Sequence, residues 1–125
     1  MTHNILAVDD SATLRAAVNA TLSPPEYKVF EAINGQEGLD FLAQARQTDL
    51  PIHLIISDIN MPIMGGIEFI KAVKQTDDRF IPILVLTTEG EREVKEQGRQ
   101  AGAAGWLVKP FQPPVLLKVV RKFIR

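Results

Sequence analysis

The sequence predicts an α/β fold in which a five-stranded parallel sheet lies between two layers of helices. Short apolar runs alternate along the chain with segments whose apolar residues recur at helical spacing, and there are five such pairs. Three of the runs are continuously apolar, as expected for strands that helices cover on both faces. Strand–helix alternation at this length favours right-handed crossovers, which place helices on both sides of the sheet.

The predicted strands are short, and they cover residues 5–8, 29–32, 54–56, 83–86 and 106–108. In a sheet of this kind, ligands bind at the carboxyl ends of the strands, near the point where the strand order reverses. The residues that follow each strand are therefore the first place to look for chemistry.

The helices between the strands show the matching apolar spacing. In the first, Ser11 is placed as the N-cap, and one face carries Leu14, Ala17, Val18, Thr21 and Leu22. The last helix begins at Pro113 and Pro114, where a missing N–H has little effect. The fourth, about residues 91–101, has a thin apolar side and contains Gly98, which weakens a helix by up to about 1 kcal/mol.

Composition narrows the function classes. With 125 residues, 46% apolar and 23% charged, we expect residues 1–125 to form a single domain. The net charge of −1 gives no field that would attract nucleic acid or an anionic membrane. No signal peptide or membrane-spanning run is visible, and cysteine is absent, so we expect a cytoplasmic monomer without disulfides or thiolate metal sites.

Polar side chains follow four of the five predicted strands: Asp9 and Asp10, Asp58, Thr87 and Lys109. If the first and third strands are neighbours, three carboxylates meet in one small volume. Two carboxylates about 5 Å apart repel each other by roughly 3 kcal/mol at an effective dielectric constant near 20, and one lysine offsets only part of this. An all-oxygen site of this charge suits Mg²⁺, whereas zinc would prefer nitrogen or sulfur ligands.

A carboxylate surrounded by a metal, a lysine and a hydroxyl is suited to phosphoryl transfer. The transferring group needs its equatorial oxygens neutralised, which the metal, Lys109 and Thr87 could do. Asp58 would be the nucleophile and would form an acyl phosphate.

Each residue also has an ordinary structural explanation. Asp9 and Asp10 could cap the first helix, Asp58 could be a turn residue, and Lys109 could extend to solvent. Taken singly, these explanations are adequate. Together they require several coincidences at one end of one sheet, and clustered titratable groups mark functional sites, so the combination favours a site.

With these motifs in place, the chain resembles the response-regulator receiver family, from Asn4 to Ile124. The motifs that carry the resemblance occur in the family's order and spacing: Asp9-Asp10, Asp58 with Asn60-Met61-Pro62-x-Met64-x-Gly66, Thr87, and Lys109-Pro110-Phe111. The resemblance implies the flavodoxin-like receiver fold with strand order 2-1-3-4-5, and a single receiver domain without an output domain.

The resemblance also implies roles for individual residues. Asp58 would accept the phosphoryl group, Asp10 would ligate Mg²⁺ directly, and Asp9 would act on the metal through water. The backbone carbonyl of Asn60 would complete the protein ligands. Thr87 and Lys109 match the family's catalytic hydroxyl and lysine.

Further positions match features that tune or transmit the signal. The side chains of Asn60 and Glu89 would set the rate of self-dephosphorylation, and the Lys109–Pro110 peptide bond would be cis. Trp106 occupies the aromatic switch position, which more often carries tyrosine or phenylalanine. Because an indole is larger than a phenol, the resemblance leaves open whether this ring swings inward.

As a single domain of this length, the chain most resembles the chemotaxis response regulators of the family. The implied partners are a histidine kinase of the chemotaxis type as phosphodonor, and a flagellar or pilus motor protein or another target. The target would be contacted through the surface of the fourth helix, fifth strand and fifth helix. Neither nucleic acid nor a membrane is expected as a partner. Apart from transferring and losing its own phosphoryl group, the protein is not expected to be an enzyme.

Four alternatives remain at this point. A phosphate sink or relay would use the same chemistry without a motor target. A small aspartate-nucleophile phosphatase also uses clustered aspartates, but it usually opens with Asp-x-Asp where this chain has Asp9-Asp10-Ser11. A flavodoxin-like electron carrier needs a phosphate-binding loop after the first strand, where two acids stand here. A binding module without chemistry would not need the reactive residues.

Overall fold

The computed structural model describes residues 2–22 and 24–124, in which five strands alternate with five helices. The strands are β1 (His3–Val8), β2 (Tyr27–Ala32), β3 (Leu54–Ser57), β4 (Ile83–Thr87) and β5 (Gly105–Val108). The helices are α1 (Ala12–Thr21), α2 (Gly35–Gln47), α3 (Gly66–Val73), α4 (Arg92–Ala101) and α5 (Pro113–Phe123). Each predicted strand and helix is present at its predicted place.

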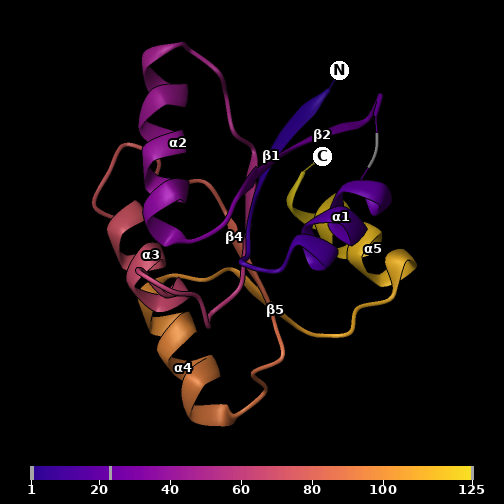
Figure 1. The fold of residues 1–125 in the computed structure, drawn as a ribbon, viewed down its shortest axis with the longest axis vertical. Coiled ribbons are helices and arrows are strands. Elements are labelled where there is room, and N and C mark those ends of the chain that lie inside the picture. The colour runs from indigo at the N-terminus through magenta and orange to yellow at the C-terminus, as the bar shows by residue number, and fades with distance from the viewer. Residues whose placement is uncertain (1, 23, 125) are drawn as a thin grey trace.

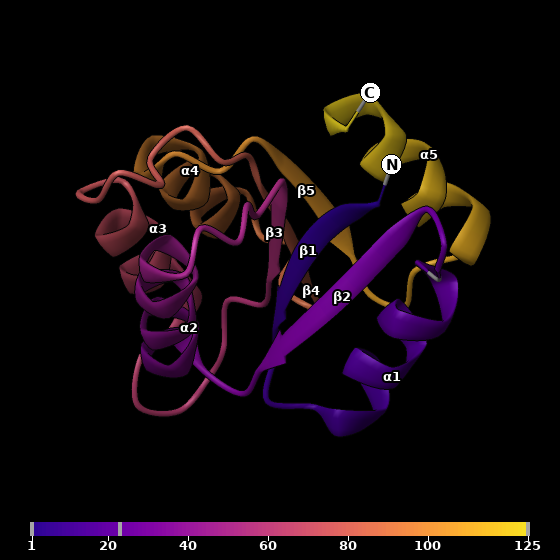
Figure 2. The ribbon, with the colours of Figure 1, turned by 90° about the horizontal axis from the view of Figure 1, so that it is seen from above.

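The strands form one parallel sheet in the order β2-β1-β3-β4-β5, which confirms the predicted fold class and strand order. Helices α2, α3 and α4 cover one face of the sheet, and α1 and α5 cover the other (Figures 1 and 2). Each face buries its own apolar cluster, centred on residues such as Leu6 and Phe69 on one side and Ile5 and Leu116 on the other. Among the described helices, none is long and apolar enough to cross a membrane.

Local signals in the sequence explain where the helices begin. The Ser11 hydroxyl accepts a hydrogen bond from the Leu14 N–H at 3.2 Å, as the predicted N-cap should. Pro113 and Pro114 occupy the first turn of α5, as predicted. One prediction for α1 is wrong: the helical spacing puts Ala17 on the apolar face with Leu14 and Val18, but Ala17 is exposed. Val18 is the buried residue of α1, so the buried stripe is narrower than the spacing predicts.

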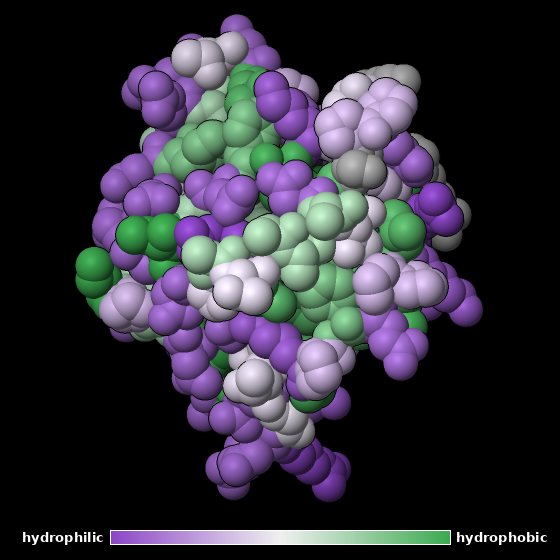
Figure 3. Space-filling model, turned by 45° about the vertical axis from the view of Figure 1, so that its right-hand side comes forward, coloured by the Kyte–Doolittle hydropathy of each residue, from purple (hydrophilic) through white to green (hydrophobic). Residues whose placement is uncertain are grey.

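The exposed side of α1 belongs to an apolar area of the surface. A hollow of about 670 Å³ lies between α1 and the segment that leads into α5, and Leu14, Ala17, Phe111 and Lys109 are among the residues that line it. Figure 3, which turns this side of the molecule forward, shows hydrophobic side chains gathered at the centre of the face and hydrophilic ones around them.

Helix α4 has the thin apolar side that its sequence predicts, but Gly98 has a specific packing role. Gly98 and Ala101 are the buried residues of this helix. A Cβ atom on Gly98 would lie 2.4 Å from Cζ3 of Trp106, which is closer than carbon atoms can pack. The missing side chain therefore makes room for the indole of Trp106 between α4 and β5.

Candidate functional site

The sheet brings the three predicted carboxylates together. Strands β1 and β3 are parallel neighbours with Val8 opposite Ser57, so the residues that follow them leave the sheet side by side. The Asp58 N–H donates to the Val8 carbonyl at 3.0 Å, which extends this pairing by one bond. Oxygen atoms of the Asp9, Asp10 and Asp58 carboxylates lie within 4.8 Å of one another.

Asp58 is fixed by its own loop. It is only 7% exposed, and its Oδ1 accepts a hydrogen bond from the Ile59 N–H at 2.6 Å. The loop then folds back, and the Gly66 N–H donates to the Ile59 carbonyl at 2.8 Å. A Cβ atom on Gly66 would lie 2.1 Å from the Asp58 carbonyl oxygen, so only glycine permits this approach.

Lys109 bridges two of the carboxylates. Its Nζ donates to Asp9 Oδ2 at 2.8 Å and to Asp58 Oδ2 at 3.1 Å. Burial disfavours the ammonium, but the hydrogen bonds to both carboxylates and their charges outweigh it, so the pKa of Lys109 is raised. The pKa of Asp9 is also raised, because burial outweighs the hydrogen bonds from Lys109 and Ser11. Lys109 therefore stays charged beside carboxylates that it neutralises only in part.

The remaining negative charge makes the cluster a candidate metal site. In the part of the chain that the structure describes, these three carboxylates pair with one ammonium, which leaves two negative charges uncompensated in a small volume. Asp9 is buried and already accepts from the Ser11 N–H and from Lys109, whereas Asp10 is exposed. An all-oxygen donor set of this charge fits a hard divalent cation.

A second chain of contacts leads from the site to Trp106. Thr87 is fully buried at the end of β4, and its Oγ1 accepts from the Glu89 N–H at 3.2 Å. Within residues 2–22 and 24–124 the hydroxyl hydrogen has no acceptor and is available to donate. The carbonyl of Glu89 in turn accepts from Trp106 Nε1 at 3.0 Å. Trp106 is half-buried opposite Val85. The Thr87 hydroxyl, at the carboxyl end of β4, is thus connected through Glu89 to the ring beneath α4.

Two further predicted positions lie beside the cluster. Asn60 is exposed in the loop that follows Asp58. The Lys109–Pro110 peptide bond is cis, and the Lys109 N–H donates to the Thr87 carbonyl at 2.7 Å. Lys109 and Thr87 are therefore tied together through the backbone as well as placed at the same end of the sheet.

Sequence reasoning missed the contribution of Arg15. Its Nη1 donates to the Asp9 carbonyl at 2.7 Å, and its Nε forms an ion pair with Glu31 at 2.9 Å. The guanidinium therefore fixes the backbone at the end of β1 to the neighbouring strand β2. The three partners come from separate elements, so no local pattern in the sequence indicates the contact.

Comparison with known proteins agrees with this geometry. Residues 5–121 match the family described as "Response regulator receiver domain". "Chemotaxis protein CheY1" of Helicobacter pylori is 40% identical over 115 residues, which cover 90% of this chain and 89% of that protein. "Sporulation initiation phosphotransferase F" of Bacillus subtilis is 30% identical over 124 residues, which cover 99% and 95%.

A solved structure of the chemotaxis response regulator CheY4 of Vibrio cholerae is similar in fold and in sequence. Its TM-score is 0.88 at 45% identity, and the match covers 99% of this chain and all of that one. The strand order, the carboxylate cluster and the family match point the same way. The chain therefore belongs to the response regulator receiver domain family.

Proposed function

We propose that this protein is a phosphorylation switch in which Asp58 accepts a phosphoryl group from a histidine kinase. The observation that carries the proposal is the position of Lys109, whose ammonium contacts Asp58 and Asp9 together. A carboxylate held by one hydrogen bond from Ile59 and one from a lysine has a fixed direction of attack, which in-line transfer requires.

The chemical step needs no general base. An oxygen of the Asp58 carboxylate attacks phosphorus, and the bond from phosphorus to the donor imidazole nitrogen breaks. The nitrogen keeps the electron pair and takes a proton. Lys109, which keeps its proton because its pKa is raised, neutralises charge on the transferring group.

The proposed cofactor is Mg²⁺. Asp10 and Asp58 would bind it directly, with the backbone carbonyl of Asn60, and Asp9 would act through water. When bound, the ion would supply positive charge to the phosphoryl oxygens. The uncompensated negative charge of the cluster supports this assignment.

Loss of the phosphoryl group would be governed by the side chains that surround it. Asn60 is exposed two residues after Asp58, and Glu89 is half-buried after β4. By the family resemblance, both side chains would affect the approach of water. Beyond transferring and hydrolysing its own phosphoryl group, the protein would not act as an enzyme.

The phosphoryl group would change the surface through Thr87. A phosphoryl group brings up to about two negative charges and three acceptor oxygens to Asp58. The free hydroxyl hydrogen of Thr87 would turn toward it and draw the loop with Glu89 inward. Trp106 Nε1 donates a hydrogen bond to the Glu89 carbonyl, so the position of the indole beneath α4 would change as well. The surface of α4, β5 and α5 is therefore the proposed output.

The proposed partners are a chemotaxis-type histidine kinase and a motility target in the cytoplasm, by analogy with the chemotaxis relatives. The apolar hollow beside Lys109 supports docking of the phosphodonor there. A relay or phosphate-sink role is the second candidate, because a phosphotransferase of sporulation initiation is also a relative. Residues 1–125 would act as a single, monomeric receiver domain.

The test is intact-mass measurement after incubation with acetyl phosphate, with and without Mg²⁺. One added phosphoryl group that requires both Mg²⁺ and Asp58 is expected. The Asp58→Asn variant should gain none, and Asp40→Asn on α2 is the matched control that should label normally. Labelling that is equal in Asp58→Asn and the parent protein would refute the assignment.

A further inference from the structure

The backbone carbonyl of Asp9 is held by an arginine that reaches back from α1. Arg15 Nη1 donates to this carbonyl at 2.7 Å, and Arg15 Nε donates to Glu31 Oε1 on β2 at 2.9 Å. Asn19, which lies one helical turn after Arg15, donates to the second oxygen of Glu31 at 3.3 Å. Glu31 is therefore held by two donors from α1, and the guanidinium is fixed by acceptors on two sides.

This carbonyl belongs to the peptide group that joins Asp9 to Asp10. Because a peptide group is planar, the direction of the carbonyl also fixes the direction in which the chain continues to Asp10. The Asp9 N–H donates to the Ala32 carbonyl at 3.0 Å, so the peptide groups on both sides of Asp9 are tied to other parts of the fold. Asp10 is exposed, so packing does little to orient its carboxylate and the backbone must do so.

Arg15 lies among the residues that support the acidic cluster. Its side chain is 15% exposed, and it lines a small internal space of about 10 Å³ together with Asp9 and Asp58. The rest of this lining is apolar and consists of Ala7, Val8, Leu14, Val18, Ile56 and Leu86. A carbonyl that loses its donor in such surroundings is not readily solvated, so the guanidinium is not easily replaced by water.

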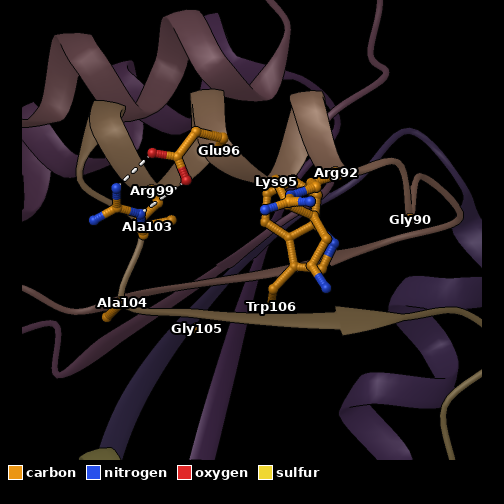
Figure 4. A pocket seen from close by; sticks show the side chains of 9 residues that line it. All are labelled: Gly90, Arg92, Lys95, Glu96, Arg99, Ala103, Ala104, Gly105 and Trp106. Atoms are coloured by element: carbon orange, nitrogen blue, oxygen red, sulfur yellow. Dashed lines mark hydrogen bonds and ion pairs between the residues drawn. The ribbon is translucent and has the colours of Figure 1, made fainter.

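An arginine–glutamate pair on the surface shows the difference. On α4, Arg99 Nε lies 3.1 Å from Glu96 Oε2 (Figure 4), and the two side chains are 72% and 47% exposed. Both residues belong to one helix, so the pair joins no separate elements, and exposed pairs of this kind contribute little to stability. Arg15 instead connects α1 with the end of β1 and with β2.

The charge of Arg15 does not explain its place beside a cluster that fits a cation. Its positive charge is balanced by Glu31, so the pair adds no net attraction for a metal ion. Removing a positive charge near a cation site would by itself strengthen cation binding. A geometric role has the opposite consequence, because a misdirected Asp10 would bind the cation less well. The two explanations therefore differ in sign.

We propose that Arg15 is a positioning residue for the metal site, which acts through the Asp9–Asp10 peptide group and thereby sets the affinity for Mg²⁺. This inference rests on the proposed function in that it takes Mg²⁺ as the cation. Residues that orient metal ligands typically change metal affinity by about 10- to 100-fold when they are replaced. Arg15 touches neither the metal ligands' carboxylates nor the reacting atoms, so its effect is on orientation alone.

The test compares the dissociation constant of Mg²⁺ in the parent protein and in Arg15→Gln by isothermal titration calorimetry. The positioning role predicts that Arg15→Gln binds Mg²⁺ at least about tenfold more weakly. Unchanged or tighter binding would overturn the proposal, because charge alone predicts tighter binding.

Arg46→Gln is the matched control. Arg46 forms an ion pair with Asp78 that also joins separate elements, at the opposite end of the sheet, and its side chain is 34% exposed. Both variants should lose unfolding free energy in EDTA, but only Arg15→Gln should bind Mg²⁺ more weakly. Equal weakening in the two variants would mean a general loss of structure and would also overturn the proposal.

A readout without metal separates this inference from the proposed cofactor. The Ser11 N–H donates to Asp9 Oδ1 at 2.9 Å, so its exchange with water reports how firmly the turn at Asp9 is held. In EDTA, exchange measured by NMR should be at least about fivefold faster in Arg15→Gln and unchanged in Arg46→Gln. If the parent protein bound no Mg²⁺, the proposed cofactor would fail, and Ser11 would still show whether Arg15 positions the turn. Unchanged Ser11 exchange in Arg15→Gln would refute that role.

Discussion

Replacing Gly98 with alanine is expected to destabilise the protein, although the same change stabilises most helices. Alanine is favoured over glycine inside a helix by about 1 kcal/mol. Here the new Cβ would lie 2.4 Å from Trp106 Cζ3, and 3.3 and 3.4 Å from two other ring carbons. Overpacking of this kind costs about 1–3 kcal/mol, so the net loss of unfolding free energy should be about 1 kcal/mol.

Urea unfolding followed by circular dichroism gives the free energy, and the emission of Trp106, the only tryptophan in the sequence, reports the position of the ring. The emission should shift in Gly98→Ala even under native conditions, because the indole must move. The decisive control is the same change in a Trp106→Leu background. Without the ring, Gly98→Ala should stabilise the protein by about 1 kcal/mol through helix propensity alone.

The sign of the change in unfolding free energy therefore decides whether the indole packs against α4. Opposite signs in the two backgrounds mean that the indole occupies the space left by Gly98. If Gly98→Ala stabilised both proteins equally, the indole would not be packed against α4, and the proposed route from Thr87 to the α4 surface would lose its physical basis.

Three further outcomes are expected. Ile63 is β-branched and 83% exposed with φ of 70°, so Ile63→Gly should raise the unfolding free energy by about 1 kcal/mol; the control Ile33→Gly should not raise it. Burial raises the pKa of Asp9 in the folded protein, so the free energy of unfolding falls as the pH rises from the ordinary pKa of 3.8 through the raised one. In EDTA, Asp9→Asn should therefore be more stable than the parent protein at neutral pH. This gain should vanish below pH 3.8. Mg²⁺ at about 100 times its dissociation constant should stabilise the protein by about 2.7 kcal/mol in thermal unfolding, and Asp10→Asn should abolish most of this. An equal Mg²⁺ effect in Asp10→Asn would exclude Asp10 as a ligand.

The fold could be predicted because local and global signals agree. Strands β3 and β4 are continuously apolar up to their last residues, Ser57 and Thr87, and they lie in the interior of the sheet, where helices cover both faces. The Ser11 cap and the two prolines that begin α5 gave correct helix starts. Ala17 was misplaced because alanine carries too little apolar surface to decide which way a helix face turns.

The site could be predicted only as a set of residues at one end of a sheet. The meeting of Asp9, Asp10 and Asp58 followed from strand order, which the resemblance supplied. Contacts that join distant elements could not be predicted, because they depend on distances of a few tenths of an ångström. Gly98 shows this best: in the sequence it is a weak point of a helix, and in the structure it is the complement of Trp106.

Phosphorylation of Asp58 is tested most directly by locating the phosphoryl group chemically. Protein labelled with acetyl phosphate and Mg²⁺ would be reduced with borohydride, which converts an acyl phosphate of aspartate to homoserine, and then mapped by peptide mass spectrometry. We expect homoserine at position 58 and unmodified aspartate at positions 9 and 10. Homoserine at another position, or a phosphate that survives on a hydroxyl or an imidazole, would contradict it.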